Sequence, residues 1–122
     1  ASTVGHDAHN LTVVGVDEAD MALAVEVLRR CGGGFIVSSG GEVRALVRLP
    51  VAGLVSDRPL VEVCESLEQA VHEAWRLGVR FRRPFMTMSF LSLTAIPELR
   101  ITDMGLVDTV EKRFVSLFVQ PQ

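Results

Sequence analysis

Two periods of hydrophobic and polar positions run along the chain and predict its first elements. The β-branched run at 11–16 predicts a buried strand. A helix is predicted over 18–31, with Asp17 as N-cap, Asp20 in the capping-box position and a glycine triplet at 32–34 ending it. The apolar residues of this segment recur at helical spacing and predict one buried face, made of Met21, Ala24, Val25 and Leu28.

The middle of the chain predicts a hairpin and a second helix. Residues 35–37 and 42–49 are favourable strands, and the Ser-Ser-Gly-Gly run at 38–41 is typical of a turn between them. A helix is expected from about 59 to 77, capped by Ser56 or Asp57. Its apolar stripe is expected to face the core and comprises Leu60, Cys64, Leu67, Val71, Ala74 and Trp75.

The last third is less regular. Residues 84–93 are strongly apolar but fit neither period, so they are expected in the core or against a neighbouring domain. Residues 96–106 predict an extended segment with a turn at 103–105, and 114–119 predict a final strand. Residues 1–4 have the pattern of the end of a strand. The order predicts one α+β domain over 1–122, a βαββαβ-like, mainly antiparallel sheet with two helices on one face.

The composition of the chain argues against some classes of function. Twelve basic and fifteen acidic residues give a net charge of −3 without a basic stripe, which argues against non-specific nucleic-acid binding. No apolar run approaches the roughly 18 residues of a membrane-spanning helix. The apolar fraction is nevertheless 48%, so part of the apolar surface is expected to be covered by another domain or subunit. Cys31 and Cys64 lack CxxC spacing and are expected to be reduced core thiols of a cytoplasmic protein.

The densest group of polar chemistry lies near the N-terminus, where His6, Asp7, His9 and Asn10 fall within five positions. In an extended chain these side chains alternate between two faces, so they converge only if the backbone bends, which Gly5 would favour. One interpretation is a polar strand entry that satisfies local backbone groups. A shared metal ion is disfavoured because three ligands so close along one strand seldom bind one ion. The glycine triplet at 32–34 follows a helix rather than preceding one, which argues against a phosphate-binding loop.

Four blocks carry a family resemblance. The His-Asp-Ala-His-Asn run at 6–10, before an apolar strand, resembles the HD-S/A-HN signature in the C-terminal domain of bacterial and archaeal adenine deaminases. Residues 49–57 resemble that domain's LPIAGLMSD segment. Residues 84–93 resemble its PFMTLSFLSL block, and residues 96–106 its IPELKITDRGL block. The blocks occur in the same order and cover essentially the whole chain.

The resemblance implies a larger enzyme. In such enzymes an amidohydrolase barrel lies N-terminal to this domain, and a hydroxide bound to iron, manganese or zinc attacks the adenine carbon that bears the amino group. Hypoxanthine and ammonia are the products. The chain would then be a C-terminal accessory piece that is inactive alone, has no cofactor of its own and partners the barrel within a homo-oligomer. The resemblance motivates the hypothesis that five residues cover the barrel's substrate pocket: His6, Asp7, His9, Asn10 and Ser89.

Two other function classes stay open at this point. Layers of this kind also occur in autonomous small-ligand-binding or regulatory modules, a comparison that rests on fold analogy alone. A purely structural oligomerisation domain is the third class, in which the polar run at 6–10 only stabilises a turn. The sequence does not separate the accessory domain from the oligomerisation domain, because both require a large apolar interface.

Overall fold

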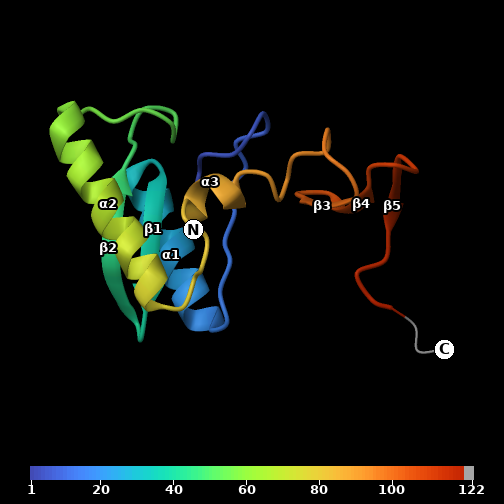
Figure 1. The fold of residues 1–122 in the computed structure, drawn as a ribbon, viewed down its shortest axis with the longest axis horizontal. Helices are drawn as coiled ribbons and strands as arrows, with labels where there is room; N and C mark the ends of the chain where they lie inside the picture. The colour runs from blue at the N-terminus through green and yellow to red at the C-terminus, as the bar shows by residue number, and fades with distance from the viewer. Residues whose placement is uncertain (120–122) are drawn as a thin grey trace.

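The computed structural model describes residues 1–119, so the last three residues of the expected 1–122 domain lie outside the described range. Five strands form two antiparallel sheets, one of β1 and β2 and one ordered β3-β4-β5 (Figure 1). The predicted α+β class is confirmed. In chain order the elements are α1 (Glu18–Cys31), β1 (Gly34–Ser39), β2 (Glu42–Arg48), α2 (Leu60–Arg76), α3 (Pro84–Met88), β3 (Leu99–Thr102), β4 (Gly105–Asp108) and β5 (Arg113–Val115).

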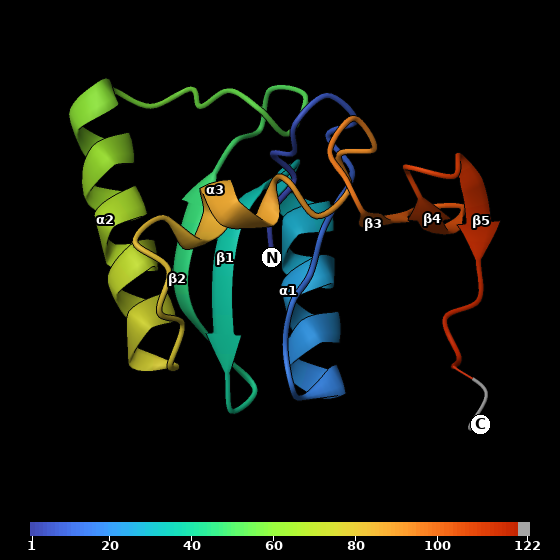
Figure 2. The same ribbon diagram turned by 45° about the vertical axis from the view of Figure 1, so that its right-hand side comes forward.

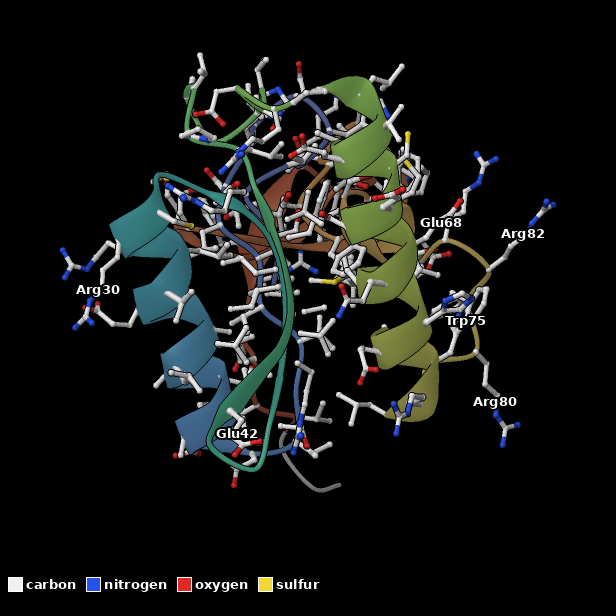
Figure 3. The ribbon with its side chains drawn as sticks, turned by 90° about the vertical axis from the view of Figure 1, so that its left-hand side faces the viewer. Arg30, Glu42, Glu68, Trp75, Arg80 and Arg82 are labelled. Atoms are coloured by element: carbon white, nitrogen blue, oxygen red, sulfur yellow. The ribbon has the colours of Figure 1, made fainter. Side chains whose placement is uncertain are left out.

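The β1–β2 hairpin is the centre of the fold, and the two long helices lie on opposite faces of it (Figure 3). The sequence expectation placed both helices on one face. The hairpin is apolar on both faces, and because side chains alternate along a strand, each face buries its own cluster. The α1 side contains Ala24, Leu28 and Ile36, flanked by Leu46. The α2 side contains Val37, Ala45, Val47, Leu49, Ala70, Ala74 and Phe85.

Helix α1 begins and ends as predicted, but one of its acidic residues has a different role. Asp17 caps the helix by accepting a hydrogen bond from the Asp20 backbone N–H at 2.8 Å. The Asp20 carboxylate does not complete a capping box. It accepts hydrogen bonds from the backbone N–H groups of Gly40 and Gly41 at 2.9 and 2.7 Å. Asp20 thereby ties the first turn of α1 to the turn of the hairpin.

The predicted strand at 11–16 is wrong. Only Thr12 pairs, in a bridge to Ser2, and the side chains of Val14 and Val16 are exposed. The outer edge of β1 is occupied by residues 1–3, which bond to the backbone of Gly34 and Ile36 and pair through an isolated bridge at Ser2 rather than as a full strand. Beyond Thr12 the run continues as a loop, without a further bridge in the described residues.

Helix α2 begins at Leu60, with Pro59 as N-cap and no side-chain cap, so the expected caps Ser56 and Asp57 lie outside it. Its buried stripe is rotated from the predicted one. Ala70 and Ala74 are buried with Val63, Leu67 and Val71 packed beside them, whereas three residues expected in the core are exposed: Leu60, Cys64 and Trp75. The expectation of a core thiol is thus wrong for Cys64, while Cys31 is half-buried. The fully buried residues of α2 are thus the alanines at 70 and 74, and alanine is only weakly hydrophobic in a periodicity pattern.

The C-terminal third begins in the core and ends outside it. The ambiguous segment at 84–93 opens with α3, whose Phe85 is buried against Phe35 with the ring centroids 4.9 Å apart. The predicted turn at 103–105 joins β3 and β4, and the predicted final strand is shortened to β5.

The sheet β3-β4-β5 extends away from the helices and the hairpin (Figure 1, Figure 2). Between Leu93 and Val119 no side chain is buried. In this sheet and the segment that follows it, seven large apolar side chains are more than half exposed: Ile101, Met104, Val110, Phe114, Leu117, Phe118 and Val119. This sheet has no core of its own, which is unusual for an autonomous domain.

Within residues 1–119, none of the helices is both long enough and apolar enough to cross a bilayer.

Candidate functional site

The polar run at 6–10 lies at the tip of a closed loop. Ser2 and Thr12 close its base through two backbone hydrogen bonds, each 2.9 Å long. The chain folds back so sharply at Gly5 that a Cβ there would lie 3.5 Å from the backbone of His9. The bend that the sequence allowed is therefore present, and the segment is a loop rather than a strand.

The loop tip has an unusual backbone. Asp7 and His9 have positive φ angles of 68° and 50°, a region that side-chain-bearing residues seldom adopt. The Ala8 N–H donates to the His6 carbonyl at 2.8 Å, which closes a three-residue turn around Asp7. Strained backbone of this kind persists where the surrounding structure holds it, and it is concentrated at functional sites.

Residues after α3 hold the loop from one side. The His6 backbone N–H donates to the Ser89 carbonyl at 3.1 Å, and the His6 ring stacks on Phe90 with centroids 4.9 Å apart and planes 23° apart. Ser89 is buried, and its hydroxyl donates to the Met86 carbonyl at 2.7 Å. Ser89 therefore reaches the loop through its backbone, and its hydroxyl is engaged within α3.

The four polar side chains differ in exposure. His6, Asp7 and His9 are exposed and Asn10 is half-buried. Within residues 1–119 no three His, Cys, Asp or Glu side chains are arranged to share a metal ion. The arrangement instead presents hydrogen-bonding groups outward from a fixed backbone.

Thr3, which was not identified from the sequence, supports the base of the loop. The Thr3 hydroxyl donates to the Gly53 carbonyl at 2.7 Å and accepts from the Gly34 N–H at 2.8 Å. Gly33 packs against the same point, because a Cβ there would lie 2.5 Å from the Gly53 Cα. The sequence offers one signal for this contact, namely the glycines at 32–34 and at 53, which allow two backbone segments to approach closely. Thr3 thus joins the loop base, β1 and the 50–55 turn into one rigid support.

Two hollows of the described surface lie away from the 5–10 loop. One of about 500 Å³ lies between the hairpin and the end of α2, lined by Val43, Arg44, Glu73 and Leu77 among others. The other, of about 260 Å³, lies between β2 and the start of α2 and includes Arg48 and Ser66. Neither includes a residue of the 5–10 loop.

Comparison with known proteins shows the family to which these residues are similar. A family model described as the adenine deaminase C-terminal domain matches residues 1–113. A protein named adenine deaminase from Moorella thermoacetica is 56% identical over 118 residues, which is 96% of this chain and 20% of the relative. Adenine deaminases from Clostridium botulinum and Desulfatibacillum aliphaticivorans are 50% and 49% identical over 98% and 97% of this chain, covering 20% and 21% of their own lengths.

The chain thus spans about one fifth of the length of the curated relatives it matches. Its signature loop, its α3 segment and its paired β3–β4 strands all fall within the matched residues. The chain belongs to the adenine deaminase C-terminal domain family.

Proposed function

We propose that the chain is the accessory C-terminal domain of an adenine deaminase, an enzyme that hydrolyses adenine to hypoxanthine and ammonia. The observation that carries the proposal is the match, over 96–98% of the chain, to relatives that are named adenine deaminase and are about five times longer. The hydrolytic chemistry and its divalent iron, manganese or zinc belong, in this proposal, to the amidohydrolase barrel outside this chain.

The 5–10 loop covers the substrate pocket of that barrel. The exposed side chains of His6, Asp7 and His9 supply hydrogen-bonding groups. This role is supported by the contacts that hold the loop in place, which come from Ser89, Phe90 and Thr3. A pre-ordered loop loses little conformational entropy when it meets a ligand, so its contacts are available for binding. Asn10 and Ser89 act indirectly, by positioning the loop.

The sheet β3-β4-β5 docks against the rest of the polypeptide. Large apolar side chains exposed along it support this, because monomeric proteins rarely leave such a surface uncovered. The parent protein is expected in the cytoplasm as a homo-oligomer. The two free thiols, Cys31 and the exposed Cys64, support a reducing compartment.

The loop's role is tested by His9→Ala in the full-length enzyme. Removing the imidazole is expected to lower kcat/KM for adenine about tenfold or more, the scale of losing one well-placed polar contact to substrate. Arg30→Ala is the matched control, because Arg30 is exposed on α1, where it bonds only Glu26. Kinetics that equal those of the control, with unchanged thermal stability, would leave the loop a structural role only.

The accessory character is tested by metal analysis and deaminase assays on residues 1–122 and on the full-length enzyme. The full-length protein is expected to be active and metal-loaded, and the 122-residue chain inert and metal-free. Stoichiometric metal or adenine turnover in the short chain would instead make the His-Asp-His run a site in its own right.

A further inference from the structure

The apolar run at 11–16 has the composition of a strand, yet only Thr12 in it is paired. Within the described residues the backbone groups of Val14 and Val16 make no hydrogen bond to other backbone groups, and both side chains are more than half exposed. Valine is one of the residues that are most enriched in paired strands. A partner strand is therefore missing beside the second half of this run.

Residues 1–3 lie between this run and the hairpin, and they bond to both. Ser2 exchanges two backbone hydrogen bonds with Thr12, each 2.9 Å long. Ala1 exchanges two with Ile36 of β1, at 2.8 and 3.0 Å. Neighbouring residues of the segment thus bond to opposite sides, which is the hydrogen-bond pattern of a central strand in an antiparallel sheet.

This pattern has a definite continuation in the N-terminal direction. Ser2 lies opposite Thr12 on one side and Phe35 on the other. The same antiparallel register places the residue directly before Ala1 between Val14 and Val37. Figure 2 shows the run at 11–16 passing the N-terminus on its way to the start of α1. Both neighbours of a longer central strand are therefore already in place.

The surroundings of the Ala1 nitrogen also suit a strand that continues. Burial lowers the pKa of this amino group to about 6, because a charged amine is unfavourable away from water. A peptide N–H at the same place makes the same hydrogen bond to Ile36 without a charge. The matched relatives are about five times as long as this chain, and the matching family model describes a C-terminal domain.

We propose that the residues directly before Ala1 in the longer enzyme form a strand between β1 and the 14–16 segment. The inference rests on the proposed function, which supplies the preceding polypeptide. Because the place lies in line with the backbone of Ala1, a strand from a second copy would have to end against that residue, whereas the preceding residues enter it without a break. The 5–10 loop then connects the two arms of a β-hairpin, and one arm leads directly to the rest of the enzyme.

A disulfide in the full-length enzyme tests the register. A cysteine replaces the residue directly before Ala1 and is combined with Val14→Cys in a Cys64→Ser background. Residues paired in this way have Cα atoms about 5.5 Å apart, which is within disulfide range. Mild oxidation is expected to join the two cysteines within one chain, as detected by mass spectrometry of the digested protein.

The matched control combines the same N-terminal cysteine with Val16→Cys, which lies two residues out of register. Its Cα atoms would be more than about 7 Å apart, so at least about fivefold less disulfide is expected. Equal yields from the two pairs, or no disulfide in either pair, would overturn the proposal.

Hydrogen exchange of the unchanged full-length enzyme gives a second readout that needs no variant. The N–H groups of Val14 and Val16 are expected to exchange about as slowly as those of β1, because both point at the proposed strand. Exchange at the rate of unpaired backbone would overturn the proposal, as would slow exchange without the in-register disulfide, since another segment would then cover the run. Neither readout depends on catalysis, so a parent that does not deaminate adenine refutes the proposed function without deciding this pairing.

Discussion

At the residue scale, the candidate site depends more on its support than on the residues that drew attention in the sequence. The polar run at 6–10 stands out because histidines and carboxylates are chemically conspicuous. Thr3 is not conspicuous, yet its hydroxyl joins three segments. A single threonine predicts nothing until a fold brings Gly34 and Gly53 beside it, so this part of the site was not predictable from local pattern.

Gly33→Ala tests the rigid support. At this position φ is +117°, and a Cβ would lie 2.5 Å from the Gly53 Cα and 2.7 Å from the Thr3 hydroxyl oxygen. Gly41→Ala is the matched control, with φ at +75° but no atom within 4 Å of the added carbon. Backbone strain of about 1–2 kcal/mol is expected for Gly41→Ala, whose φ lies near the left-handed helical region, and at least as much for Gly33→Ala. Gly33→Ala is expected to cost at least about 2 kcal/mol more, because only there must the neighbouring backbone move.

The measurement is the unfolding free energy in urea for both variants and the unchanged protein. Equal losses in the two variants would mean that the contact between the glycine triplet and the 53 turn does not hold the loop base.

At the element scale, the sequence predicts what local chemistry determines. Helix α1 has a cap and a glycine stop, and the hairpin has its turn residues, so both were located from pattern alone. The run at 11–16 and the buried face of α2 depend on which strand edge is free and on how closely alanine lets a helix approach the hairpin. Those are tertiary facts, and they override propensity.

Asp20 connects two of these elements, so Asp20→Ala is expected to loosen α1 from the hairpin turn. The substitution removes both hydrogen bonds to the N–H groups of Gly40 and Gly41. A cost of about 1–3 kcal/mol is expected, the usual range for bonds to a charged group. Glu18→Ala, in the same helical turn but exposed, is the control and is expected to cost under about 1 kcal/mol. A thermal melt that shifts no further for Asp20→Ala than for Glu18→Ala would refute this link.

At the scale of the whole molecule, the structure shows where the excess apolar residues of the composition are exposed. The excess lies mainly on β3-β4-β5 and the segment after it, where the described part of the chain buries no side chain. The sequence predicted that some apolar surface needs a cover. It did not predict where, because the exposure of a strand face depends on the packing of the other elements.

We expect the sheet β3-β4-β5 and the 5–10 loop to meet the catalytic part of a longer enzyme. Hydrogen exchange of the full-length protein, with and without a purine ligand, tests it most directly. Peptides covering 99–115 are expected to be protected in both states, although none of their side chains is buried in this domain. Peptides covering 6–10 are expected to slow further when the ligand binds. Rapid exchange at 99–115, together with no ligand effect at 6–10, would contradict the claim.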